Sequence, residues 1–364
     1  MEIEAGCLIY CGRPYYDAKI RSKRGRGSYY FETVVYPGFA DAHAHPQVGD
    51  YGRGRWRDSA EWIRNRELEV DEGSLRRDVE LSKKLAKAAM LKSLLEGTTL
   101  IAVVGSYRAN IEAALELDSR PRTVVMPTLY EQSGWQRLWE VLGELKRLAR
   151  VAERYNVKLG LFCHSVEFTS REELLESYRI AQNNGLVLGL HLSEGRRELG
   201  ELRRILGLPG RRSIVGIHCL MDEDYRSAGV RVVSCPASNL VLYGRTRERL
   251  VDVDALGTDW PLLLGGVVEQ HGLLVELGVD PLESLEKATA GGYRVYGVDF
   301  DGDFVAYDEK VGKVLGGKCG RPAYVFVDWR PLVVEGVLGS LEGDHVEKVV
   351  RGLVREAIDR HPAV

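Results

Sequence analysis

The sequence lacks the features that would assign it to several large protein classes. It has no basic excess, because 50 Lys and Arg face 53 Asp and Glu and the formal net charge is −3. Nucleic-acid-binding proteins typically carry such an excess, and disordered chains are poor in apolar residues, whereas 45% of these residues are hydrophobic. No apolar run approaches the roughly 18 residues that cross a bilayer. We therefore expect a folded protein with no nucleic-acid partner and no membrane association.

Cysteine is also scarce. The six cysteines are scattered through 364 residues, which differs from the dense pattern of a secreted disulfide scaffold. Cys7 and Cys11 have the spacing of half a metal site, but no second pair follows, so buried thiols are the better interpretation. The first residues, Met1–Glu4, show no basic segment followed by an apolar one, as a secretory signal would. These features predict a cytoplasmic protein.

Apolar segments rich in β-branched residues alternate along the chain with segments of helical periodicity. The eight predicted strands are 33–36, 98–104, 123–126, 157–162, 186–190, 213–217, 230–234 and 253–256, and helical spacing is clearest in 81–95, 135–154, 171–183 and 198–206. Eight such units over about 260 residues predict an α/β fold, a (β/α)8 TIM barrel, whose buried parallel strands are nearly continuously apolar. A doubly wound sheet is the alternative, disfavoured because no glycine-rich phosphate-binding sequence follows the first strand.

Both ends of the chain have β character outside this alternation. Residues 1–32 are strand-like, and the segment 303–336 returns to apolar, β-branched sequence. We predict that residues 1–36 and 302–340 form a small composite β-sandwich and that residues 37–301 form the barrel. Residues 341–364 are predicted to form a C-terminal helix on the outside.

Only eight histidines are present, and four of them stand where predicted strands end. The sequence PGFADAHAHP after the first predicted strand holds His43 and His45, which point to the same side of an extended segment. His191 and His218 end two further strands, and Asp259 follows the eighth. Because barrel active sites lie at the C-terminal ends of strands, these side chains should meet. Nitrogen and oxygen ligands suit zinc or another first-row divalent ion at a catalytic site.

These motifs together resemble those of a known family. PGFADAHAHP is followed by HLSE at 191–194, HC at 218–219, SCPASNL at 234–240 and GTD at 257–259. This order resembles the amidohydrolase superfamily, and within it the branch of cytosine, guanine and adenosine-type deaminases, over residues 34 to about 300. The resemblance implies one divalent metal ion, zinc first and iron as the alternative, with His43, His45, His191 and Asp259 as ligands. It also implies that His218 hydrogen-bonds the attacking water or the substrate.

The end of the fourth predicted strand bears on the number of metal ions. Binuclear members of the superfamily place a carboxylated lysine there, but the segment 160–167 has no lysine. A mononuclear site is therefore favoured. A second ion bridged by Glu167 or Cys163 is the alternative.

Glu194, three residues after a predicted ligand, indicates the reaction. The resemblance implies that it shuttles a proton from the metal-activated water to a ring nitrogen while Asp259 and His218 hold the attacking oxygen, so that ammonia leaves. An acid that merely favours the dipole of the next helix is the alternative. We predict a hydrolase acting on non-peptide carbon–nitrogen bonds, most simply a deaminase of a purine, a pyrimidine or a derivative. A cyclic amide hydrolase or chlorohydrolase of the same superfamily is the runner-up, and a non-catalytic scaffold is disfavoured by the complete set of site residues.

Contacts to the small-molecule substrate are predicted from position alone. His164 and Glu167 follow the fourth strand, where polar rim residues are the alternative interpretation. Trp56 and Trp62 lie in the long connection after the first strand, a candidate lid. Trp260 follows the GTD motif, where relatives usually continue with small polar residues, so one pocket wall should differ from theirs. The sequence leaves open whether the chain forms a homo-oligomer.

Overall fold

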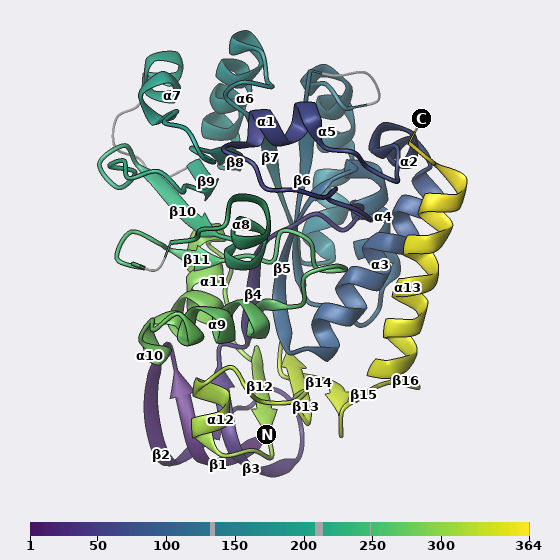
Figure 1. The fold of residues 1–364 in the computed structure, drawn as a ribbon. Helices are drawn as coiled ribbons and strands as arrows, with labels where there is room; N and C mark the ends of the chain where they lie inside the picture. The colour runs from purple at the N-terminus through teal and green to yellow at the C-terminus, as the bar shows by residue number, and fades with distance from the viewer. Residues whose placement is uncertain (132–134, 208–213, 248, 364) are drawn as a thin grey trace.

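Two eight-stranded sheets organise the computed structural model, which describes residues 1–131, 135–207, 214–247 and 249–363 (Figure 1). The first sheet is the barrel, in which each strand pairs in parallel with the next in chain order. Its strands are β4 (Phe39–Ala44), β5 (Thr98–Gly105), β6 (Arg122–Leu129), β7 (Val157–Ser165), β8 (Val187–Leu192), β9 (Ile214–His218), β10 (Val230–Ser234) and β11 (Ala255–Leu256). Past β11, Asp259 pairs with Ala44 in a parallel bridge that brings the last strand back to the first. The predicted (β/α)8 barrel is confirmed.

Most of the helices lie around the barrel, whereas α12 (Val311–Leu315) lies beside the terminal sheet (Figure 1). The helices are α1 (Ser59–Asn65), α2 (Glu72–Arg77), α3 (Val79–Leu95), α4 (Tyr107–Glu116), α5 (Leu138–Arg154), α6 (Arg171–Asn184), α7 (Leu199–Leu206), α8 (Pro236–Tyr243), α9 (Val267–Glu276), α10 (Pro281–Glu286), α11 (Gly292–Tyr296), α12 and α13 (Gly343–Arg360). Strands buried on both faces explain the apolar sequence runs; every residue of β5, for example, is buried. None of the helices in the described ranges combines the length and hydropathy that a bilayer crossing needs.

The second sheet joins the two ends of the chain at the N-terminal side of the barrel (Figure 1). Its order is β16-β15-β14-β13-β12-β3-β1-β2, and antiparallel pairing of β12 with β3 connects the C-terminal strands to the N-terminal ones. The strands are β1 (Glu2–Tyr10), β2 (Arg13–Arg21), β3 (Ser28–Tyr36), β12 (Phe304–Tyr307), β13 (Tyr324–Val327), β14 (Arg330–Val334), β15 (Val337–Leu338) and β16 (Leu341–Glu342). A composite sheet from both termini is thus present, while the division into domains at 36/37 and 301/302 stays a prediction.

One predicted barrel strand belongs to the other sheet. Residues 33–36 form the end of β3, whose buried Val34 and Val35 pair with β1 and β12, and the first barrel strand is β4. Both segments are apolar and buried, so composition does not reveal which sheet each one joins. The predicted strand 213–217 matches β9 from Ile214 onward, and its first residue lies outside the described residues.

The connection between β4 and β5 is folded over the C-terminal end of the barrel. Its two short helices begin at capping aspartates: Asp58 accepts a hydrogen bond from Glu61 N before α1, and Asp71 accepts one from Ser74 N before α2. The C-terminal helix α13 runs beside α3 (Figure 1). His361 anchors its end, with Nδ1 2.8 Å from Ser74 Oγ and Nε2 3.0 Å from Asp78. This arrangement brings α1 and α2 to the mouth of the barrel.

Candidate metal centre and active site

Four buried side chains converge at the C-terminal end of the barrel. His43, His45, His191 and Asp259 each offer one ligand atom, and these atoms lie within 4.8 Å of one another. The Nε2 atom of His191 lies 3.2 Å from that of His45 and 3.3 Å from that of His43. Asp259 Oδ1 lies 3.5 and 3.6 Å from the Nε2 atoms of His43 and His45.

This geometry fits a divalent ion. Ligand atoms about 2.0–2.2 Å from one ion, in tetrahedral directions, lie roughly 3.3–3.6 Å apart. Burial lowers the pKa of His43, His45 and His191, which favours the neutral imidazoles that bind metals. Burial alone would raise the pKa of Asp259, but its hydrogen bond with His43 and the neighbouring imidazoles hold that pKa below its ordinary value. Among the described residues no second group of such ligands occurs, Cys163 and Glu167 included.

Asp41, to which the sequence motifs assigned no role, connects the strand that carries His43 with the loop that carries Asp259. It is fully buried and accepts hydrogen bonds from His43 N (3.2 Å), Thr258 N (3.0 Å) and Thr258 Oγ1 (2.6 Å). Burial raises the pKa of Asp41 to about 7. The side chain therefore positions β4 against the loop that carries Asp259.

Gly257 packs against His43 in β4, and a replacement at this position tests how tightly the two residues fit. A Cβ at Gly257 would lie 2.8 Å from His43 N and 2.9 Å from His43 Cβ. Gly257→Ala should therefore displace His43 and cost about 1–3 kcal/mol of stability, as overpacking does. We expect a lower zinc content and a lower Tm, measured by metal analysis and calorimetry.

Gly200→Ala is the matched control, because Gly200 is exposed on α7 and a Cβ there meets nothing within 4 Å. That replacement should leave zinc content unchanged and stabilise the helix by roughly 0.5–1 kcal/mol. Unchanged zinc content and Tm in Gly257→Ala would contradict the tight packing of Gly257 on His43.

Beside the metal-binding group lies a second cluster built around Glu194 and His218. The Glu194 carboxylate is buried, accepts a 2.5 Å hydrogen bond from the Tyr243 hydroxyl and lies 3.5 Å from His218 Nε2. His218 Nδ1 donates to Asn239 Oδ1 at 2.8 Å, which leaves Nε2 facing Glu194 and, at 3.9 Å, Asp259. Burial raises the pKa of Glu194 above its ordinary value, and His218 and Tyr243 oppose this effect.

Two backbone features concern this second cluster: the conformation of His218 and Asp259, and the start of helix α7. His218 and Asp259 have left-handed φ values of 68° and 66°, a conformation that non-glycine residues keep mainly where surrounding structure imposes it. The N-terminus of α7 is occupied by Glu198, not by Glu194. The helix-dipole interpretation of Glu194 is therefore wrong.

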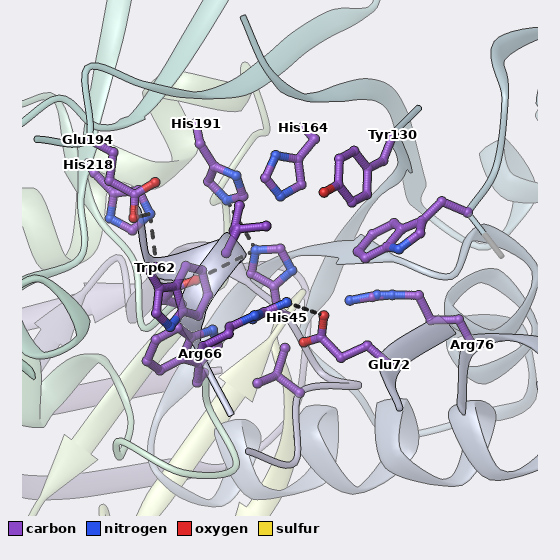
Figure 2. Close-up of a pocket in the computed structure, with 15 residues that line it drawn as sticks. His45, Trp62, Arg66, Glu72, Arg76, Tyr130, His164, His191, Glu194 and His218 are labelled. Carbon is purple, nitrogen blue, oxygen red and sulfur yellow. Dashed lines mark hydrogen bonds and ion pairs between the residues drawn. The ribbon is translucent and has the colours of Figure 1, made fainter. Parts of the chain in front are cut away.

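A cavity opens beside these residues, and Figure 2 shows the side chains around it. Its described lining is His45, Val48, Trp62, Ile63, Arg66, Glu72, Arg76, Tyr130, Trp135, His164, His191, Glu194, His218, Asp259 and Trp260. The cavity volume is about 40 Å³, whereas ligand pockets measure roughly 300–1,000 Å³. A heterocycle can enter only if side chains move, and Trp62 and Arg66 come from the connection predicted as a lid.

The predicted substrate contacts divide into two groups. Trp62, His164 and Trp260 line the cavity, whereas Trp56 and Glu167 do not. Trp56 packs against a buried cluster formed by Val48, Leu242 and Trp260. Glu167 forms ion pairs with Arg64 and Arg196 on the rim. Counting from strand ends cannot distinguish a side chain that points into the barrel mouth from its neighbours that point along the rim.

Several lining residues were not predicted as substrate contacts, above all Glu72, Arg76, Tyr130 and Trp135. Tyr130 directly follows β6, so the strand-end rule could have found it, and its ring stacks on His164 with centroids 4.5 Å apart. Nothing local in the sequence marks Glu72 or Arg76, which are charged residues of a short helix. Of the histidines without a predicted role, His271 is buried and bonded to Ser284 and Leu315 O.

Comparisons with known proteins agree with the fold. No protein-family model matches the chain. A curated relative, 5′-deoxyadenosine deaminase of Methanothermobacter thermautotrophicus, is 23% identical over 314 residues, covering 73% of this chain and 70% of the relative. Atrazine chlorohydrolase TrzN from Arthrobacter aurescens TC1 complexed with zinc is 16% identical, with a TM-score of 0.75 over 97% of this chain and 99% of that one.

A zinc-bound adenosine deaminase from Xanthomonas campestris is 16% identical, with a TM-score of 0.71 over 99% of this chain and 98% of that one. An amidohydrolase from an environmental sample of the Sargasso Sea is 17% identical, with a TM-score of 0.71 over 99% of both chains. The resemblance that the sequence motifs indicate is therefore confirmed, and the chain has the fold of the amidohydrolase superfamily.

Proposed function

We propose that this protein is a mononuclear, metal-dependent hydrolase that deaminates an amino-substituted heterocycle. The observation that carries the proposal is the placement of Glu194: a buried carboxyl group beside His218 and the metal-binding group, at the wall of the cavity. His43, His45, His191 and Asp259 would hold the ion. A zinc ion supplies Lewis acidity and lowers the pKa of bound water to about 7.

The protein's own residues supply the proton transfers. Because burial raises the pKa of Glu194, this carboxyl group can both accept a proton and release it to a ring nitrogen. The Tyr243 hydroxyl, donating to Glu194 Oε1, fixes the direction of the carboxylate. His218 Nε2, oriented by the Asn239 bond at Nδ1, is placed to hydrogen-bond the attacking oxygen. Protonation of the ring makes the adjacent carbon more electrophilic, and ammonia leaves after the second proton transfer.

Aromatic side chains favour a flat substrate. Trp62 and Trp260 line the cavity with their ring centroids 5.8 Å apart, and the Tyr51 ring stacks on Trp260 with centroids 4.9 Å apart. Two of the similar proteins, named as 5′-deoxyadenosine deaminase and adenosine deaminase, support an aminopurine nucleoside as the first substrate class to test. All six cysteines are free, which agrees with a reducing compartment, and we propose the cytoplasm.

An ammonia-release assay tests this function. The zinc-loaded protein should release ammonia from at least one member of a panel containing adenosine, 5′-deoxyadenosine, guanine and cytosine. Atrazine and a cyclic amide such as hydantoin test the alternative function, a chlorohydrolase or cyclic amide hydrolase. The structural similarity to atrazine chlorohydrolase is the reason to include it. Glu194→Gln protein, purified in parallel, controls for contaminating deaminases. No ammonia from the panel, together with chloride release or ring opening, would contradict deamination.

A further inference from the structure

The far end of the cavity carries an unbalanced positive charge. Arg66 and Arg76 both line it, but Glu72 is the one carboxylate among the lining residues of that end (Figure 2). Glu72 is already paired, since Arg66 Nη2 donates to its Oε2 at 2.7 Å and both side chains are largely buried. Arg76 forms no ion pair with any of the described residues, although the negative charge of Glu72 still acts on it.

The Arg76 side chain is 9% exposed and lies over the Trp135 ring, with Cζ 3.6 Å from the ring centroid. Within the described part of the chain its Nε and Nη1 atoms have no hydrogen-bond partner. Burial lowers the pKa of Arg76 to about 10, with Glu72 opposing and Arg66 assisting this shift. A buried guanidinium with unsatisfied N–H groups is costly, and it binds an anion strongly where one can reach it.

Local structure explains why the side chain is present but not what it binds. Arg76 stands in the last turn of α2, where a cation is favourable to the helix dipole, and Trp135 adds a cation–π contact. Neither interaction uses the in-plane N–H groups. The adjacent Arg77 is exposed and would serve the helix dipole equally well, so the dipole does not require a buried arginine.

The charge of Arg76 faces the reaction site. Arg76 lines the same cavity as His45, His191 and Glu194. In Figure 2, Arg76 and Glu194 stand at opposite ends of the lining, with His45 between them. A ligand with its amino-bearing ring near Glu194 would therefore extend its other end toward Arg76.

We propose that Arg76 binds an anionic group of the substrate, a carboxylate or a phosphate, so that the substrate is an anionic amino-heterocycle rather than a neutral one. This inference rests on the proposed deaminase function and specifies its substrate class. The planar guanidinium, held against Trp135, would donate N–H groups to the oxygens of the anion. The Arg66–Glu72 pair then forms the wall beside it.

Binding to protein that cannot turn over tests the proposal. Zinc-loaded Glu194→Gln protein is titrated calorimetrically with adenosine, adenosine 5′-carboxylate and adenosine 5′-monophosphate. At least one anion should bind about tenfold or more tightly than adenosine, as a hydrogen-bonded charge pair allows. The two anions distinguish a carboxylate site from a phosphate site. Adding Arg76→Gln should reduce the preference to less than about twofold, and Arg77→Gln should preserve it.

Arg76→Lys guards against a folding defect, because it keeps the charge and loses the two-pronged geometry; we expect it to retain part of the preference. Equal binding of neutral and anionic ligands, or a preference that survives Arg76→Gln, would overturn the assignment. If ammonia is released from neutral adenosine and Arg76→Gln changes nothing, the deaminase function stands and the anion site falls.

A second arm covers the case in which no aminopurine binds, so that the deaminase proposal itself fails. Inorganic phosphate and acetate are then added alone in thermal melts of wild-type, Arg76→Gln and Arg77→Gln proteins. One of these anions should raise the Tm of the wild-type and Arg77→Gln proteins but not that of Arg76→Gln. The same response in all three proteins would refute an anion site at Arg76.

Discussion

Glu194→Gln is expected to lower kcat by about 10²–10⁴-fold, the usual contribution of a general acid–base, while zinc content stays at the wild-type level. Glutamine has the same shape, and its Oε1 can still accept the hydrogen bond that Tyr243 donates to Glu194. It cannot carry a proton between the attacking oxygen and a ring nitrogen. Activity measured by ammonia release and zinc measured by elemental analysis on the same preparation would separate the loss of proton transfer from the loss of metal.

Tyr243→Phe provides a graded comparison. It removes the donor to Glu194 Oε1 but leaves the carboxylate in place. Hydrogen bonds to charged groups contribute about 1.5–3 kcal/mol, so kcat should fall roughly ten- to a hundredfold, less than in Glu194→Gln. Near-wild-type activity of Glu194→Gln would remove Glu194 from the proton transfers, whatever Tyr243→Phe does.

The metal-binding group was predictable because each ligand ends or follows a barrel strand. His43 and His45 are two residues apart, and the barrel topology brings His191 and Asp259 to the same end. Because side chains at the C-terminal ends of barrel strands lie close together, four separate sequence positions could be assigned to one site. Composition, in contrast, misassigned the first strand, because residues 33–36 are apolar and buried like a barrel strand but join the terminal sheet.

The rest of the site depends on contacts between distant segments that no local pattern records. The Tyr243 hydroxyl reaches Glu194 from α8, and Trp135 reaches Arg76 across the mouth of the barrel. Trp56 and Trp62 looked equivalent in the sequence, but α1 begins between them at Ser59 and turns only Trp62 toward the cavity. Which residues of a lid face a ligand is set by tertiary packing, not by their spacing.

Loss of the metal should be as damaging as loss of the proton shuttle, and His191→Ala tests this. His191 Nε2 lies 3.2 Å from His45 Nε2 and 3.3 Å from His43 Nε2, so its removal leaves three ligands and an opening. Removing groups that merely orient metal ligands costs roughly 10–100-fold, so deleting a ligand should lower zinc affinity and kcat/KM by more than about 100-fold. Binding of zinc to the native state also stabilises it, by about 4 kcal/mol at a thousandfold excess over Kd. We therefore expect added zinc to raise the Tm of the chelator-treated wild-type protein but not that of His191→Ala.

His345→Ala is the matched control, because His345 is exposed near the start of α13, and it should respond to zinc like the wild type. The two site variants can then be distinguished by whether added zinc raises their Tm. Glu194→Gln keeps the zinc-dependent rise in Tm without activity, whereas His191→Ala loses both. If His191→Ala kept stoichiometric zinc and the same rise in Tm, His191 would not be a ligand on which zinc binding depends, and the four-residue ligand set would be wrong.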